Sequence, residues 1–172
     1  MNERPDTLSA PFVLSRRFDA PRSLVFEVFS RLEHLQRWMS PAGMEPVGGS
    51  LDFREGGTYH YGLRGPDGQV MWGKWTFREI QAPERLVTVV QFSDAEGGVT
   101  RHPWAPGWPL YTLSTTTFEE IEGQTLMTLR WQALDATPAE VQLFEASTAS
   151  MEQGWGGTLA QLTDYLNTLQ KG

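Results

Sequence analysis

The hydrophobic pattern near the C-terminal end of the chain predicts a long amphipathic helix over residues 138–169. Apolar or small residues recur there at steps of three and four, which places them on one helical face. The resulting stripe consists of Val141, Phe144, Thr148, Met151, Trp155, Leu159, Leu162, Leu166 and Leu169. Thr137 and Glu140 have the spacing of a capping box, and Pro138 suits the first helical position. Because so long a stripe needs a large partner, we expect the helix to close a sheet.

Three glycines, Gly154, Gly156 and Gly157, interrupt the middle of this predicted helix. Each costs about 1 kcal/mol relative to alanine in a helix interior. Close packing or space for a ligand would explain their presence.

The first part of the chain predicts one strand and two short helices. Residues 1–10 are polar and read as a flexible lead-in. A strand is expected over residues 12–18, and Pro21 then suits the start of a helix. Apolar faces over residues 24–29 and 32–38 predict two short helices in tandem.

From residue 51 the hydrophobic period changes to two, which predicts antiparallel strands. A hairpin is expected at 51–61, and later strands are expected at 70–80, 86–92, 110–120 and 125–134. Residues 101–109 contain three prolines and are expected to form a loop. The pattern therefore predicts an α+β fold, with a curved antiparallel sheet of about six to seven strands wrapped around the long C-terminal helix. Residues 11–170 form one domain in this interpretation, and a cavity is expected between sheet and helix.

Composition excludes several classes of function. The 172-residue chain has a formal net charge of −7, which argues against nucleic-acid binding. It has no cysteine, so thiolate catalysis and sulfur-ligated metals are excluded and a cytoplasmic location is the default. No apolar run reaches the length of a membrane span. We therefore expect neither nucleic acid nor a membrane as a partner.

The sequence offers no pattern for a metal, a cofactor or a catalytic centre. His34, His60 and His102 are far apart and lack metal-ligand spacing. No nucleophile elbow and no nucleotide-binding glycine motif is present. The carboxylates of the central strands are expected at the surface, where Asp52 pairs with Arg54; the set comprises Asp52, Glu55, Glu119, Glu120 and Glu122.

Aromatic side chains form the one set that suggests a binding site. We predict that a ligand cavity is lined by Trp38, Phe53, Tyr59, Tyr61, Trp75, Phe77, Phe92, Trp131, Met151 and Trp155. The alternative is that these side chains form an ordinary hydrophobic core without a ligand site. Arg54, His60 or Tyr61 would be polar anchors for the ligand. Trp104 and Trp108 belong to a predicted lid loop, for which a surface loop or a contact between subunits is the alternative.

The order of the motifs resembles the superfamily of START-domain and birch-pollen-allergen-like proteins (SRPBCC), in the branch of activator of heat-shock protein 90 ATPase homologues. The matching motifs are Phe18-Asp19-Ala20-Pro21 with Val25-Phe26, His34-Leu35 to Trp38, Pro41-Ala42-Gly43, Asp52-Phe53-Arg54-Glu55-Gly56-Gly57, Pro66-Asp67-Gly68, Ile80-Gln81-Ala82-Pro83-Glu84-Arg85-Leu86-Val87, and Glu152-Gln153-Gly154-Trp155 with Leu159 and Leu162. They cover roughly residues 11–169. The resemblance implies a helix-grip fold.

Three functions remain open at this point. The first is binding of a small hydrophobic or aromatic ligand in the cavity, together with a stress-related role. The second is an enzyme of the same superfamily, a cyclase or hydrolase with His60 or Tyr61 as acid-base group. The third is an interaction protein whose aromatic loop contacts a chaperone or forms a homodimer. No motif matches the separate chaperone-binding domain of the full cochaperone, so chaperone activation is not implied.

Overall fold

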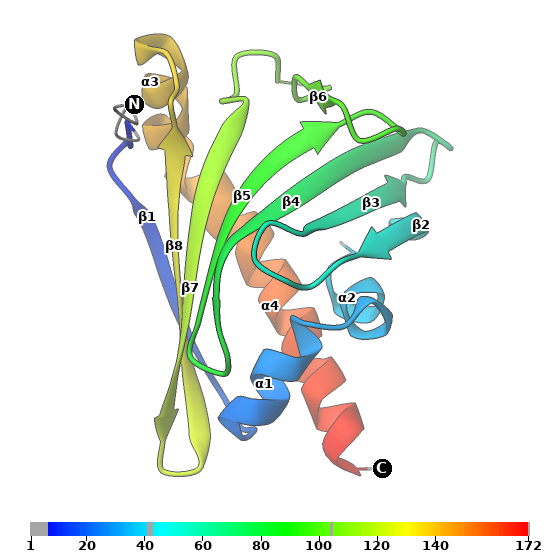
Figure 1. The fold of residues 1–172 in the computed structure, drawn as a ribbon, viewed down its shortest axis with the longest axis vertical. Helices are drawn as coiled ribbons and strands as arrows, with labels where there is room; N and C mark the ends of the chain where they lie inside the picture. Colours follow the sequence, from blue (N-terminus) through cyan, green and yellow to red (C-terminus); the bar gives the residue numbers. More distant parts are fainter. Residues whose placement is uncertain (1–6, 41–42, 104, 172) are drawn as a thin grey trace.

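The computed structural model describes residues 7–40, 43–103 and 105–171, and a curved antiparallel sheet forms its body (Figure 1). The strands are β1 (Phe12–Phe18), β2 (Glu45–Leu51), β3 (Thr58–Arg64), β4 (Val70–Gln81), β5 (Arg85–Ser93), β6 (Val99–Thr100), β7 (Tyr111–Ile121) and β8 (Gln124–Leu134). Seven of them follow the order β1-β8-β7-β5-β4-β3-β2, and the short β6 pairs with β5. The predicted α+β class and curved sheet are confirmed.

Four helices accompany the sheet in the described part of the chain, namely α1 (Arg22–Val28), α2 (Leu32–Trp38), α3 (Pro138–Ala146) and α4 (Thr148–Lys171). Figure 1 shows α4 running across one face of the sheet, with α1 and α2 beside its C-terminal half and α3 at the opposite end. The strand over 12–18 and the two short helices agree with the prediction. None of the described helices combines the length and the apolar character that crossing a membrane requires.

The prediction of a single long helix over residues 138–169 is wrong in one respect, because the helix is interrupted at Ser147 and continues as a second helix. This residue has φ −99° and ψ 17°, outside the helical region, and it separates α3 from α4. The hydroxyl of Ser147 donates to the Leu143 carbonyl oxygen at 2.7 Å, and that of Thr148 donates to the Glu145 carbonyl oxygen at 3.2 Å. Threonine hydroxyls inside α4 make bonds of the same kind without interrupting that helix, so these bonds accompany the break and do not explain it. The capping box of Thr137 and Glu140 is present.

The hairpin predicted at 51–61 also differs from the structure. Its first strand, β2, lies earlier at Glu45–Leu51 and carries an irregularity between Val47 and Ser50. Gly48 and Gly49 both have positive φ there, which breaks the alternation that a sequence pattern detects. Phe53 therefore follows the end of the strand instead of belonging to it.

The main hydrophobic core fills only one end of the space between sheet and α4. The largest buried side chains at this end include Phe18, Trp38, Phe118, Leu159 and Leu162. The helical ones among them come from α2 and from the middle of α4, and these two helices pack together. The N-terminal half of α4 faces the other end of the sheet, and this end holds the cavity.

Candidate functional site

A cavity of about 550 Å³ lies between the sheet and the N-terminal half of α4. Its walls come from strands β2, β3, β4, β5, β7 and β8, from the ends of α1 and α2, from α3 and α4, and from described residues of the loop before β7. Known small-molecule pockets span about 300–1,000 Å³, so this volume suits a ligand. Protein interiors contain few voids larger than a water molecule, which makes a cavity of this size unusual for a plain core.

Strand alternation explains how the sheet supplies the cavity wall. Successive side chains of a strand point to opposite faces, so every second residue faces α4. On β4 these residues are Met71 and Trp75, and on β8 they are Met127, Leu129 and Trp131. The helix adds Met151, Gly154, Trp155 and Thr158 from one face of α4.

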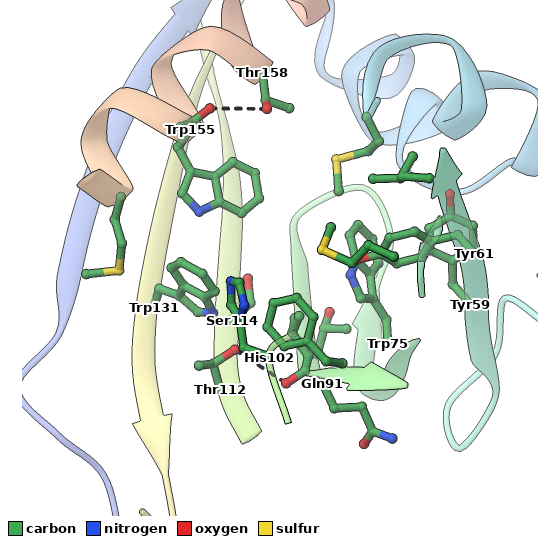
Figure 2. A pocket seen from close by; sticks show the side chains of 18 of the residues that line it. Tyr59, Tyr61, Trp75, Gln91, His102, Thr112, Ser114, Trp131, Trp155 and Thr158 are labelled. Carbon is green, nitrogen blue, oxygen red and sulfur yellow. Dashed lines mark hydrogen bonds between the residues drawn. The ribbon is translucent and has the colours of Figure 1, made fainter. Parts of the chain in front are cut away.

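Two aromatic groups stand on opposite sides of the cavity. Tyr59 and Tyr61 stack with their ring centroids 4.9 Å apart, and Trp75 meets Tyr59 edge-on at 5.1 Å. On the other side Trp131 meets Trp155 edge-on, with 5.9 Å between centroids. Figure 2 shows these two groups facing each other across the space where Ser114 and His102 lie. A flat apolar molecule between them would contact rings on both sides.

Both tyrosines remain protonated hydrogen-bond donors at neutral pH. Burial raises the pKa of the Tyr61 hydroxyl to about 12. Burial, with a smaller contribution from the neighbouring Tyr61, raises the pKa of Tyr59 well above its usual range. Of the three predicted polar anchors, Tyr61 lines the cavity, whereas Arg54 and His60 do not.

The structure places the three histidines in different surroundings. His60 stacks on Trp72 outside the cavity lining, and its Nε2 lies 3.1 Å from the Asp94 carbonyl oxygen. His34 Nδ1 lies 2.6 Å from the Tyr165 hydroxyl and links α2 to α4. His102 lines the cavity beside Phe92, and burial lowers its pKa. Over residues 7–40, 43–103 and 105–171, no three acidic, histidine or cysteine side chains gather as a metal site would require.

Seven of the ten side chains in the predicted aromatic set line the cavity, namely Tyr59, Tyr61, Trp75, Phe92, Trp131, Met151 and Trp155. The structure does not bring Trp38, Phe53 and Phe77 to it. Trp38 is fully buried in the main core, where its Nε1 donates to the Val28 carbonyl oxygen at 2.9 Å. Phe53 packs against Phe77 with 5.1 Å between centroids, also in the main core. A contribution of the seven to ligand binding stays a prediction.

Sequence reasoning missed a row of hydroxyl side chains on the cavity floor. Thr112, Ser114 and Thr116 of β7 line the cavity, and so does Thr88 of β5. All four residues are buried. Threonine and serine occupy both faces of β7, so the sequence shows no contrast between inward and outward positions. The one available signal is alternation along the strand. Thr112, Ser114 and Thr116 precede the apolar Phe118 at steps of two residues, which assigns them to the same face of the sheet as Phe118.

The loop after β6 contributes to the cavity through Trp108, whereas Trp104, the other predicted lid residue, lies outside the described residues. Arg101 forms an ion pair with Glu140 of α3 and donates to the Trp108 carbonyl oxygen at 3.4 Å. The pKa of Glu140 is lowered, chiefly by the hydrogen bond from the Thr137 backbone N–H; burial opposes this, and Arg101 lowers the pKa further. The loop is thus tied to α3.

The cavity lining carries no charged side chain. No Asp, Glu, Lys or Arg is among the residues that line it within the described chain. The predicted surface carboxylates are all exposed, and Asp52 pairs with Arg54 at 2.7 Å. One buried donor at the cavity wall, the Trp131 Nε1–H, has no hydrogen-bond partner in the described structure.

A curved antiparallel sheet that encloses a cavity with a long C-terminal helix defines the helix-grip class of SRPBCC-like proteins. Within this class, the sequence matches the family described as Activator of Hsp90 ATPase homolog 1-like protein over residues 19–167, and the chain belongs to that family. No curated protein matches the chain.

Solved bacterial structures share the fold. Protein Ms6760 from Mycobacterium smegmatis is 20% identical, with a TM-score of 0.74 over 94% of this chain and 97% of that chain. A protein from Arthrobacter aurescens is 26% identical, with a TM-score of 0.76 over 93% of this chain and 87% of that chain. Protein NE0264 from Nitrosomonas europaea is 20% identical, with a TM-score of 0.74 over 95% and 97% of the two chains.

Proposed function

We propose that this domain binds a small hydrophobic or aromatic molecule in the cavity between the sheet and α4. The observation that carries the proposal is the cavity of about 550 Å³ with its mainly apolar lining. A void of that size in a folded domain forfeits packing contacts that a close-packed core would make. A ligand that fills it restores those contacts.

The aromatic groups on the two sides support binding of a ring-containing molecule. Tyr61 and Trp75 on one side and Trp131 and Trp155 on the other present ring surfaces to the same space. Tyrosine and tryptophan combine apolar area with one hydrogen-bond donor each, so they can hold a ligand and orient it.

The loop that carries Trp108 serves as the lid in this proposal. Trp108 lines the cavity, and its ring centroid lies 6.2 Å from that of Trp131. The Arg101–Glu140 ion pair holds the loop against α3. Access to the part of the cavity beside Trp108 then requires that this pair separate or that the loop move with α3.

Placing a charge in the lining tests the proposal. The probe is N-phenyl-1-naphthylamine, an uncharged aromatic compound whose fluorescence rises in apolar surroundings. The first variant is Met151→Lys, at a buried lining position. The second is Gly154→Asp, where a new Cβ meets nothing within 4 Å, so that the fold has room for the change. Gly157→Asp is the matched control, because Gly157 has the same open surroundings but is not part of the lining.

We expect saturable one-to-one binding of the probe by the unaltered protein. Met151→Lys should lower the affinity at least tenfold, since burying an unpaired charge beside an apolar ligand is costly, and Gly154→Asp, at an exposed edge of the lining, should lower it less. Gly157→Asp should leave the affinity unchanged. Absence of saturable binding, or equal affinity in all four proteins, would overturn the proposal.

A further inference from the structure

We propose that the cavity selects an uncharged aromatic ligand that places a hydrogen-bonding oxygen on a hydroxyl patch formed by Thr88, Ser114 and Thr116. This inference rests on the proposed function and specifies the chemistry of the ligand. It follows from the position of the three hydroxyls, from their lack of partners and from the charge of the lining.

The patch is compact because the two strands that carry it are neighbours. Thr88 of β5 lies directly opposite Ser114 of β7 in the antiparallel register. Directly opposed residues have Cβ atoms about 4.5–5.5 Å apart. Thr116 is two residues further along β7, a distance of about 7 Å. Ser114 is also opposite Trp131 of β8, so the patch lies beside an aromatic wall.

The three hydroxyls have no hydrogen-bond partner among the described side chains and backbone groups, whereas the nearby Thr112 hydroxyl donates to the Val90 carbonyl oxygen at 3.4 Å. Only Ser93 Oγ and Trp131 Nε1 are, in the described chain, both unpaired and sealed from solvent. The unpaired oxygens of Thr88, Ser114 and Thr116 are therefore open to the cavity. A buried polar group without a partner is unfavourable, so a ligand oxygen that bonds with this patch gains affinity.

The lining excludes ligands that carry a full charge. It contains no Asp, Glu, Lys or Arg in the described structure. Arg101 of the neighbouring loop and Glu140 of α3 pair with each other outside the lining. His102 is the one histidine of the lining, and burial lowers its pKa, so it is neutral at pH 7. A carboxylate or an ammonium group would lose its hydration without meeting a counter-charge.

Three compounds with one ring skeleton test the inference, namely 2-hydroxyfluorene, fluorene and fluorene-2-carboxylate. The affinity of each compound is measured by its displacement of bound N-phenyl-1-naphthylamine. The dissociation constant is calculated for each variant with that variant's own dissociation constant for the probe. The variants are Ser114→Ala, Thr88→Val and Thr116→Val, which remove the hydroxyls one at a time. Thr115→Val is the matched control on β7, because the side chain of residue 115 points to the opposite face of the sheet and is not part of the lining.

We expect Ser114→Ala to weaken binding of 2-hydroxyfluorene by about three- to tenfold, the effect of one hydrogen bond. Binding of fluorene should be unchanged or tighter in the same variant, and Thr115→Val should alter neither compound. Fluorene-2-carboxylate should bind the unaltered protein at least tenfold more weakly than fluorene at pH 7.

The inference is overturned if the ratio of the two affinities, hydroxyfluorene to fluorene, is the same in the unaltered protein and in all three patch variants. Equal binding of the carboxylate would overturn it as well. Both results leave probe binding intact, so the proposed function survives them. If the protein does not bind the probe at all, the proposed function fails and the inference with it.

Discussion

The ring of Tyr61 lies directly over Gly73, its partner across the β3–β4 pair. The two residues face each other in the antiparallel register, and a Cβ on Gly73 would stand 2.5 Å from Tyr61 Cζ. Glycine at position 73 thus gives the tyrosine the room to lie flat on the sheet and to stack on Tyr59. The shape of this cavity wall depends on the absence of one side chain.

Gly73→Ala should therefore destabilise the protein by about 1–3 kcal/mol, because the new methyl group pushes the Tyr61 ring out of place. Urea denaturation measures the change. In a Tyr61→Ala background the same substitution should cost less, since the ring that it displaces is gone. Equal costs in the two backgrounds would show that the ring and the glycine do not interact as described.

The glycines of α4 lie in open surroundings, whereas Gly73 is crowded by the Tyr61 ring. A Cβ at Gly154 or Gly157 meets no atom of the described structure within 4 Å, and at Gly156 it meets only Arg16 Nη2 at 4.0 Å. Close packing, one of the two explanations that the sequence offers, is therefore wrong for these residues. Space beside the cavity remains as an explanation for Gly154, which belongs to the lining.

Gly157→Ala and Gly154→Ala should each stabilise the protein by about 1 kcal/mol, because alanine restricts the unfolded chain and meets no obstacle here. The midpoint of thermal unfolding should rise in both variants. A fall in either midpoint would mean that the helix needs glycine at that position for a reason of packing.

Alternation predicts the inward side chains of the long, regular strands. The period of two in β4 assigns Met71 and Trp75 to one face, and both line the cavity. The same reasoning misplaces Phe53, because β2 ends at Leu51 and the chain turns before this residue. Trp38 shows a second limit, since its burial in the core depends on how α2 packs on the rest of the fold.

The polar part of the site could not be predicted in the same way. Hydroxyl residues occur on both faces of β7, so neither hydropathy nor period distinguishes Ser114 from Thr115. Their difference arises from the neighbours that the sheet brings to each face, Thr88 and Trp131 in the case of Ser114. The break at Ser147 is likewise absent from the sequence pattern, because the apolar stripe runs on at helical spacing from Phe144 to Thr148 and Met151.

The Glu140 carboxylate, which accepts from the Thr137 backbone N–H and pairs with Arg101, predicts a dependence of stability on pH. The pKa of Glu140 in the folded protein lies below its usual value of 4.5, so the ionised side chain stabilises the fold above that pH. This contribution is lost as the pH falls below 4.5 and through the lower value of the folded state. Glu140→Gln keeps an oxygen acceptor for the Thr137 backbone N–H but removes the charge.

We expect the unaltered protein to exceed Glu140→Gln in free energy of unfolding by about 1 kcal/mol at pH 7, the order of one charge-assisted hydrogen bond. The difference should shrink as the pH falls below about 4.5. Urea denaturation at several pH values between 7 and 3 gives both curves. Curves that stay parallel over that interval would contradict the assignment.

The methionines of the chain allow the central claim, a ligand between sheet and α4, to be measured directly. Of the six methionines, Met39, Met71, Met127 and Met151 line the cavity, Met44 is described but does not line it, and Met1 lies outside the described residues. Labelling their methyl groups with ¹³C therefore yields four reporters of the cavity and an internal control on the same chain.

The measurement is a titration of this labelled protein with 2-hydroxyfluorene, followed by NMR. Binding in the cavity predicts saturable shifts of the Met39, Met71, Met127 and Met151 methyl signals with one common dissociation constant, while the Met44 signal stays in place. A shift of Met44 as large as those of the four cavity methionines, or no shift of any methyl group up to the solubility limit of the compound, would contradict the account.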